Sequence, residues 1–236
     1  QRLALESNLH RALEREELVL VYQPKLELAT GRVTGVEALM RWQHPTLGMV
    51  SPAQFIPIAE DTGLIESMGQ WALEVACRDA LRWQEEGHPV QVSVNLSPRQ
   101  LNRPRLVEEV AQILALAGLD ASLLELEITE SGVMRNPTRA AAQLRELRDL
   151  GVSLAIDDFG TGYSSLSYLQ RFPLGTLKID RSFIKDLPGD EDAAALTAGI
   201  IGLAQRLRMK VVAEGVETLE QLGFLRTHHC DQIQGY

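Results

Sequence analysis

The sequence predicts a modified TIM-type (β/α)8 barrel that is preceded by a β-hairpin and has one strand antiparallel to the others. Short apolar segments alternate with longer amphipathic segments along most of the chain, and no Gly-x-Gly-x-x-Gly turn follows any apolar segment. Repeated strand–helix units without that turn favour a parallel α/β barrel over a dinucleotide-binding sheet. The chain has 236 residues, 45% of them hydrophobic, which is enough to enclose one large core.

The hairpin is predicted near the start of the chain, where residues 18–28 and 33–42 flank the turn Ala29-Thr30-Gly31-Arg32. Residues 2–17 precede it and have the pattern of a charged amphipathic helix. Further strands are predicted at residues 90–95, 123–129, 152–157, 176–180, 210–214 and 231–234. Helices are predicted at residues 52–61, 64–86, 105–117, 138–150, 164–171, 191–208 and 218–228.

Two parts of the chain are expected. Residues 1–17 are interpreted as an N-terminal connector helix, and residues 18–236 as a barrel whose C-terminal end is incomplete. The chain begins at Gln1 and stops at Gln234-Gly235-Tyr236, directly after a predicted strand. We interpret it as a cytoplasmic domain excised from a longer protein, and the parent chain is compatible with a membrane anchor.

Charge and cysteine content narrow the possible partners. A net charge of −9 argues against a basic surface for DNA. No apolar run reaches the roughly 18 residues that span a bilayer, so we expect no direct membrane contact by this domain. Cys77 and Cys230 are too few for a disulfide framework, which fits a reducing compartment.

Polar side chains recur on one face of each predicted barrel strand. Side chains alternate along a strand, so the apolar face of each strand should pack against the outer helices and the polar face should point into the barrel. The inward polar residues near C-terminal strand ends are Asn95, Glu127, Asp157, Lys178 and Glu214. Barrel enzymes place their active sites at this end. The alternative is that these faces are the solvated side of an antiparallel sheet.

The pair Asp157-Asp158 is the most informative local feature. It ends an apolar run, no Lys or Arg lies within that run, and a glycine-bearing loop follows at once. Burying a carboxylate without a partner costs several kcal/mol, so a divalent cation is expected at this strand end. Alternation directs Asp157 into the barrel, whereas Asp158 must turn inward to contribute. Oxygen ligands without His or Cys suit Mg²⁺ or Mn²⁺, and several carboxylates can hold two ions.

Eight short motifs follow one another along the chain. The first two are Tyr22-Gln23-Pro24 and Glu37-Ala38-Leu39, the latter in the setting Gly35 to Trp42. The others are Val94-Asn95-Leu96-Ser97, Glu127-Ile128-Thr129-Glu130-Ser131, Asp157-Asp158-Phe159-Gly160-Thr161-Gly162, Leu177-Lys178-Ile179-Asp180, Ala213-Glu214-Gly215-Val216-Glu217 and Gln234-Gly235-Tyr236. In this order they resemble the EAL domain family of bacterial cyclic di-GMP phosphodiesterases, whose signature is Glu37-Ala38-Leu39. Met40 stands where Leu is usual in that family, and by alternation it faces outward.

The resemblance implies the roles of individual residues. It implies that the metal ligands are Glu37, Asn95, Glu127, Asp157, Asp158 and Glu214, with Asp157 bridging two ions. It implies that Lys178 positions the attacking water or offsets carboxylate charge. Glu214 is either a metal ligand or the general base, and the sequence does not choose between these roles.

The resemblance also implies a substrate-contacting set and a loop. The implied substrate contacts are Gln23, Leu39, Arg41 and Gln234, with Gln23 and Gln234 alternatively ordinary strand-end glutamines. Arg41 lies two pleats beyond Glu37, about 13 Å along the strand, and can reach a phosphate at the rim or form a surface salt bridge instead. The loop that links metal binding to dimerisation contains Phe159, Gly160, Thr161 and Gly162, and Glu130 anchors it. Glu217 is expected to support the site, and Asp180 to pair with Lys178; Glu130 and Glu217 are alternatively helix-start carboxylates.

The function implied is hydrolysis of cyclic di-GMP to the linear dinucleotide pGpG by water that two cations, Mg²⁺ or Mn²⁺, activate. The alternative is a receptor that binds cyclic di-GMP without cleaving it. The resemblance also implies a homodimer and an upstream sensory or GGDEF-type domain in the parent chain. The intact acidic motifs favour catalysis over the receptor.

Overall fold

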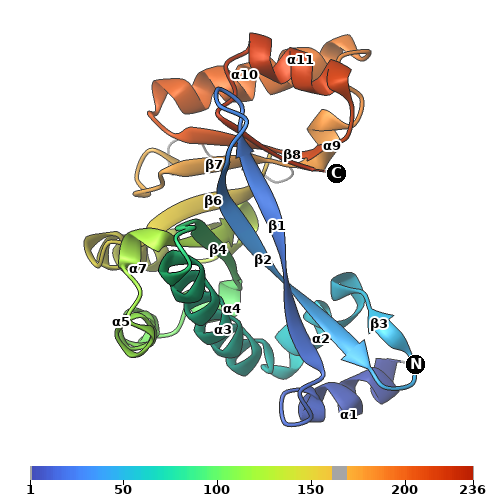
Figure 1. The fold of residues 1–236 in the computed structure, drawn as a ribbon, viewed down its shortest axis with the longest axis vertical. Helices are drawn as coiled ribbons and strands as arrows, with labels where there is room; N and C mark the ends of the chain where they lie inside the picture. The colour runs from blue at the N-terminus through green and yellow to red at the C-terminus, as the bar shows by residue number, and fades with distance from the viewer. Residues whose placement is uncertain (1, 161–168, 236) are drawn as a thin grey trace.

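A long antiparallel hairpin runs through the molecule and belongs to both of its parts. The computed structural model describes residues 2–160 and 169–235. Strands β1 (Leu18–Glu27) and β2 (Val33–His44) pair from Leu18 opposite Trp42 to Leu26 opposite Val33. Figure 1 shows this hairpin, in blue, extending from the barrel to the lower part of the molecule. The predicted hairpin is confirmed, with β2 two residues longer than expected.

Eight of the described strands close into a mixed barrel. Going round from β2, the further barrel strands are β4 (Gln91–Leu96), β5 (Leu124–Thr129), β6 (Ser153–Phe159), β7 (Thr176–Ile179), β8 (Lys210–Val216) and β9 (Gln232–Gly235). Each pairs in parallel with the next, and β1 closes the ring with antiparallel pairing to both β9 and β2. The predicted modified (β/α)8 barrel with one antiparallel strand is confirmed.

Helices cover the outside of this barrel (Figure 1). The longer ones are α3 (Ile65–Glu85), α5 (Leu106–Ala117), α7 (Pro137–Asp149), α10 (Glu191–Arg206) and α11 (Leu219–Thr227). The outward strand faces are fully buried beneath them, as Leu124, Leu126 and Ile128 show. The predicted helix at residues 164–171 falls largely outside the described residues. Within the described ranges, no helix combines the length and the apolar character needed to cross a membrane.

Several short elements are additions to the predicted set. They are β3 (Gly48–Val50), α4 (Pro98–Leu101), the 3-10 turn η1 (Ala121–Leu123), α6 (Glu130–Met134) and α9 (Arg181–Ile184). None is long enough to repeat a helical or strand period. The two short helices α4 and α9 begin instead at N-cap residues. The Ser97 side chain accepts a hydrogen bond from the backbone N–H of Gln100, and the Asp180 side chain accepts one from the backbone N–H of Ser182.

A small lobe forms around the far end of the hairpin. Helices α1 (Arg2–Ala12) and α2 (Pro52–Thr62) pack there against Trp42, with β3 pairing along the end of β2. The predicted helix at residues 2–17 is therefore too long, because the chain turns at Glu16, whose φ is +55°. The buried Glu17 carboxylate then accepts a hydrogen bond from the Trp42 indole. The connector prediction for residues 1–17 stays a prediction, but α1 packs as part of this lobe.

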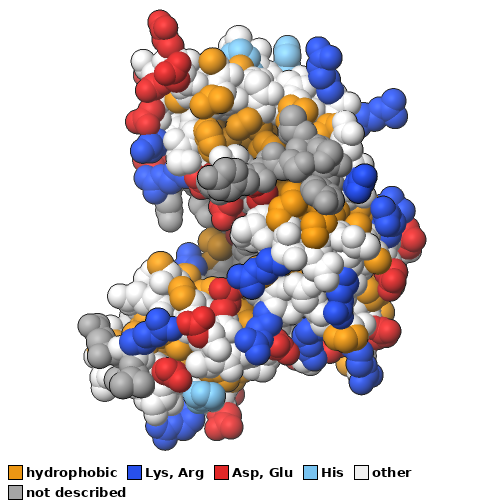
Figure 2. Space-filling view, turned by 180° about the vertical axis from the view of Figure 1, so that it is seen from behind, with side chains coloured by type: hydrophobic (Ala, Val, Ile, Leu, Met, Phe, Trp, Pro, Cys, Tyr) orange, Lys and Arg blue, Asp and Glu red, His pale blue; other side chains and the backbone are white. Residues whose placement is uncertain are grey.

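The space between the lobe and the barrel is open. Figure 2 shows the molecule from behind, hollowed between the lower lobe and the part that carries the C-terminal strands. A cavity of about 290 Å³ lies in this region, lined by lobe residues such as Ile56 and Glu60 and by barrel residues such as Asn95 and Thr129. The C-terminal ends of the barrel strands therefore face a cleft.

Candidate active site

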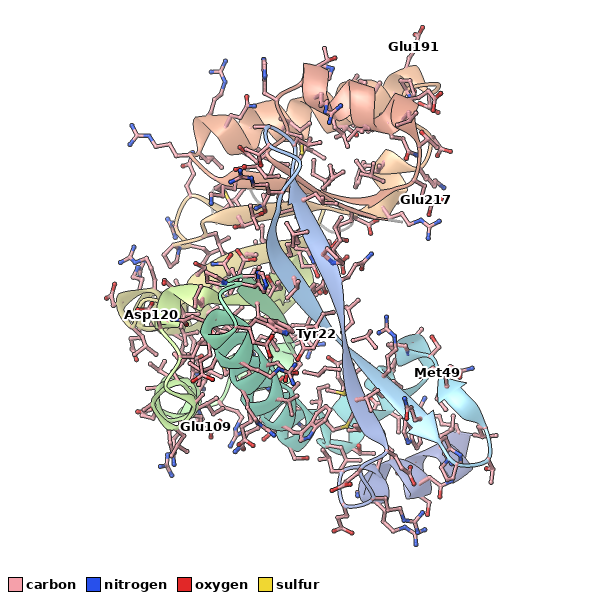
Figure 3. The ribbon with its side chains drawn as sticks, in the orientation of Figure 1. Tyr22, Met49, Glu109, Asp120, Glu191 and Glu217 are labelled. Carbon is pink, nitrogen blue, oxygen red and sulfur yellow. The ribbon has the colours of Figure 1, made fainter. Side chains whose placement is uncertain are left out.

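The barrel strands bring the predicted polar residues together inside the barrel. Tyr22 shows which side chains of β1 point out of the barrel. Its hydroxyl donates a hydrogen bond of 2.6 Å to Asp79 of α3, which lies outside the barrel. Figure 3 shows Tyr22 on the hairpin beside α3. The next residue, Gln23, therefore faces inward, and it pairs in register with Glu37. The polar faces of the other strands also point inward, so the interpretation as a solvated antiparallel sheet is wrong.

Lys178 lies at the centre of the cluster. It is fully buried, and its Nζ lies 3.2 Å from Glu37 Oε2, 3.2 Å from Asp157 Oδ1 and 2.7 Å from Glu214 Oε1. It also donates a very short hydrogen bond to Glu127 Oε2. Asp157, which the sequence left without a cation, thus gains one from a strand farther along the chain. Four carboxylates nonetheless share one ammonium group, which leaves an excess of negative charge.

Glu37 is held by hydrogen bonds on both oxygens. Asn95 Nδ2 donates to Oε1 at 2.7 Å, and Gln234 Nε2 donates to Oε2 at 2.6 Å. Gln234 Nε2 also donates to Gln23 Oε1 at 2.9 Å. The predicted metal ligands Glu37 and Asn95 and the predicted substrate contacts Gln23 and Gln234 therefore form one connected network.

Burial and mutual repulsion shift the pKa values of the cluster. Burial, reinforced by neighbouring carboxylates, raises the pKa of Asp157 to about 7 against the opposing charge of Lys178. Burial also raises the pKa of Glu214, again against Lys178. Burial would raise the pKa of Glu127 too, but the ammonium groups of Lys178 and Lys25 outweigh it and lower that pKa to about 2. In the metal-free protein the carboxylates thus differ strongly in their affinity for protons.

Asp158 turns inward at an irregular point of β6. The predicted strand ended at Asp157, whereas β6 continues to Phe159 with a break in its pairing to β7 after Ile156. At this break Asp158 adopts a φ of +55°. Carboxylate oxygens of Asp157, Asp158 and Glu214 then lie within 4.8 Å of one another. An all-oxygen group of this kind, beside Glu37 and its neighbours, fits Mg²⁺ or Mn²⁺.

The residues predicted to contact substrate lie along the cleft wall. Leu39 borders the 290 Å³ cavity and also a cavity of about 250 Å³ that includes Glu37, Asp157 and Glu214. Arg41 lines the larger cavity, and its Nη1 donates to the backbone oxygen of its neighbour Met40 at 2.9 Å. A substrate bridging the two cavities would therefore lie between Arg41 and the carboxylates.

Glu130, the predicted loop anchor, contacts the start of that loop. Glu130 is buried, and its Oε2 accepts a hydrogen bond from the backbone N–H of Gly160 at 3.2 Å. Glu130 also begins α6, so its alternative interpretation as a helix-start carboxylate applies as well. Phe159 is buried in the main core. Thr161 and Gly162 lie outside the described residues.

Asp180 makes a different contact from the one expected, whereas Glu217 borders the cavity of the site. Asp180 was expected to pair with Lys178, but its carboxylate caps α9 through the backbone N–H of Ser182 at 3.0 Å. Burial, and after it the charge of Asp180, raises the pKa of Asp158, so Asp180 influences the site through its charge. Glu217, at the barrel rim in Figure 3, is exposed and forms an ion pair of 3.0 Å with Arg181.

A second polar group lies beneath the site and was given no role from the sequence. It consists of Lys25, Ser93, Glu125 and Thr176, which are all buried. Alternation placed Ser93, Glu125 and Thr176 on the inward faces, so their position was predictable. Alternation also directs Lys25 inward, because Lys25 follows the inward-facing Gln23 by two residues on β1.

Comparison with known proteins identifies the family of this chain. The EAL domain family model matches residues 6–236. The chain is 50% identical over its whole length to "Cyclic di-GMP phosphodiesterase NbdA" and 47% identical to "Bifunctional diguanylate cyclase/cyclic di-GMP phosphodiesterase MucR", both of Pseudomonas aeruginosa. It spans 30% and 35% of those proteins, so it matches about a third of their length.

Solved structures agree with this match. The structure titled "PaMucR Phosphodiesterase, c-di-GMP complex" superimposes with a TM-score of 0.95 at 47% identity, covering 98% of this chain and 94% of that one. The FimX EAL domain gives a TM-score of 0.91 at 26% identity, covering 98% and 93%. Together with the barrel and its inward carboxylates, these matches show that the chain belongs to the EAL domain family.

Proposed function

We propose that this domain hydrolyses cyclic di-GMP to the linear dinucleotide pGpG with the help of two divalent cations, Mg²⁺ or Mn²⁺. The observation that carries the proposal is the convergence of Glu37, Glu127, Asp157 and Glu214 on one buried ammonium group at the cleft. Relatives that are 50% and 42% identical carry the name cyclic di-GMP phosphodiesterase. The excess of negative charge would repel a phosphodiester unless cations offset it.

The proposed cation ligands are the six residues of the sequence prediction. They are Glu37, Asn95, Glu127, Asp157, Asp158 and Glu214, and Asp157 would be shared. Cations bound there would neutralise phosphate oxygens and make a water molecule acidic enough to attack phosphorus.

The chain's own residues perform the remaining tasks. Lys178 stays protonated, because the carboxylates around it raise its pKa well above the usual range although burial alone would lower it. It therefore holds the carboxylates at short range and can donate a hydrogen bond to the attacking water. Arg41, beyond Leu39 on the cleft wall, would hold a phosphate, and Gln23 and Gln234 would hold polar groups near the site.

Glu214 has two proposed roles, cation ligand and general base. Burial raises its pKa, which suits a group that accepts a proton near neutral pH. Glu214→Gln distinguishes the roles in a Mn²⁺ titration. Retained Mn²⁺ affinity with lost cleavage would assign Glu214 as the base, whereas lost affinity would assign it as a ligand.

The deciding experiment is incubation with cyclic di-GMP and Mg²⁺ or Mn²⁺, with and without EDTA, followed by chromatography of the products. The expected result is pGpG that forms only without chelator. Binding without cleavage in the presence of metal would support a receptor instead. A protein that neither binds nor cleaves would contradict both.

Two partners are part of the proposal. A homodimer is proposed because the Glu130–Gly160 contact adjoins the segment that the family resemblance links to dimerisation. Sedimentation of the domain over a concentration series tests it, and a monomer throughout would refute it. An upstream sensory or GGDEF-type domain is proposed because the chain matches only about a third of the length of two relatives, one of which is named as bifunctional.

A further inference from the structure

The lower polar layer is built on the same strand faces as the site. Ser93 and Glu125 precede the site residues of β4 and β5 by two positions, and Thr176 does so on β7. Ser93 Oγ donates to Glu125 Oε2 at 2.8 Å, and Thr176 Oγ1 donates to Glu125 Oε1 at 2.8 Å. This layer lies two residues deeper along the strands than the site, and its hydroxyl groups hold the buried carboxylate of Glu125 in place.

Lys25 connects this layer to the site. Its Nζ donates to Ser93 Oγ at 2.6 Å, to Glu125 Oε2 at 3.0 Å and to Glu127 Oε1 at 2.6 Å. The side chain is only 3% exposed, so the ammonium group depends on these three partners.

The two oxygens of Glu127 have different lysine partners. Oε1 is held by Lys25, and Oε2 by Lys178. Lys178 also contacts three other carboxylates of the site, so it can give up one contact and keep the rest. Lys25 contacts none of those three, and its remaining partners lie in the lower layer. A cation can therefore compete with Lys178 for Oε2, whereas Oε1 stays with Lys25.

We propose that Lys25 is a positioning residue that leaves Glu127 a single oxygen for a cation and so favours Mn²⁺ and Mg²⁺ over Ca²⁺. The inference rests on the proposed metal-dependent function. Mg²⁺ requires compact octahedral coordination, whereas Ca²⁺ takes more oxygens and often both oxygens of one carboxylate. Removing the charge of Lys25 would strengthen the binding of every divalent cation alike. The inference is therefore tested by the ratio of the Mn²⁺ and Ca²⁺ affinities, not by either affinity alone.

The test uses Lys25→Met, which keeps an unbranched side chain of nearly the same length and removes its charge. Lys185→Met is the matched control, because Lys185 is exposed and loses the same charge. Dissociation constants for Mn²⁺ and Ca²⁺ are measured by calorimetry on metal-free protein without nucleotide. We expect the preference for Mn²⁺ over Ca²⁺ to fall about tenfold in Lys25→Met and to stay unchanged in the control.

A second variant keeps the test decisive if Lys25→Met does not fold. Lys25→Met/Glu125→Leu replaces the buried ion pair by apolar side chains, a change that proteins often tolerate. The same loss of preference is expected. A folded variant with the Mn²⁺-to-Ca²⁺ ratio of the unaltered protein would overturn the inference and leave the proposed function standing. Failure of the unaltered protein to bind Mn²⁺ would overturn both.

Discussion

Gln234 donates a hydrogen bond from Nε2 to Glu37 Oε2 across 2.6 Å, although 197 positions separate the two residues. Gln234 lies on β9 and Glu37 on β2, and both strands flank the antiparallel strand β1. The same Nε2 reaches Gln23 on β1. The orientation of a proposed metal ligand thus depends on the closure of the barrel, which joins its first and last strands.

Glu37→Gln should remove cleavage and keep the fold. The amide retains the shape of the side chain but is a poor ligand for a hard cation. We expect activity to fall by at least about 100-fold, the usual effect of losing a group that stabilises transition-state charge. Product chromatography measures the loss, and thermal unfolding checks the fold.

Glu85→Gln, at the exposed end of α3, is the control for that change and should keep full activity. If Glu37→Gln cleaved cyclic di-GMP at the normal rate, Glu37 would not be a metal ligand.

Gly215→Ala should destabilise the protein by about 1–3 kcal/mol. Gly215 follows Glu214 with a φ of +67°, and an added Cβ would lie 2.4 Å from Cγ of Arg181. Gly118→Ala is the control, because its φ is +71° but no atom lies within 4 Å of the added Cβ. Urea unfolding should show a larger loss at Gly215 than at Gly118, and equal losses would mean that the Arg181 contact is relieved without cost.

The sequence predicted the barrel because the alternation of strands and helices is a local pattern. The two-residue period places Asn95, Glu127 and Lys178 on the polar faces of their strands, and the helices between the strands indicate that these faces point inward. The family resemblance added the role of each residue. Neither source identified Lys25, because its partners lie on β4 and β5 and only the closed barrel brings them to its ammonium group.

The wrong predictions have a common cause. Asp180 was paired with Lys178 because both share one strand face, but the strand ends before Asp180 and a helix begins there. The continuation of β6 through Asp158 was also missed, since it requires a positive φ and a break in pairing that no period reveals. Where a strand gives way to a turn, the alternation rule no longer predicts side-chain direction.

Cys77 and Cys230 should resist thiol reagents in the native protein. Both are buried, and burial raises the pKa of each thiol to about 12. At pH 8 the reactive thiolate is then scarce and inaccessible. We expect almost no colour with Ellman's reagent before denaturation and two thiols afterwards, so rapid labelling of either cysteine in native buffer would contradict this burial.

The metal-free protein should become more stable as pH falls from 7 to 5. Burial raises the pKa of Asp157 to about 7, above the value of about 3.9 for an unfolded chain. The folded state therefore binds this proton more tightly, so the contribution is fully present below about pH 4 and is lost as pH rises to 7. Its slope is at most about 1.4 kcal/mol per pH unit.

Urea unfolding in EDTA at pH 5, 6 and 7 measures this dependence on pH. Asp157→Asn should flatten it, because an amide does not titrate. Asp149→Asn, on the exposed surface beside Arg148, should keep it. An equal pH dependence in Asp157→Asn and the unaltered protein would place the proton elsewhere. Glu214, whose pKa burial also raises, is the group to substitute next.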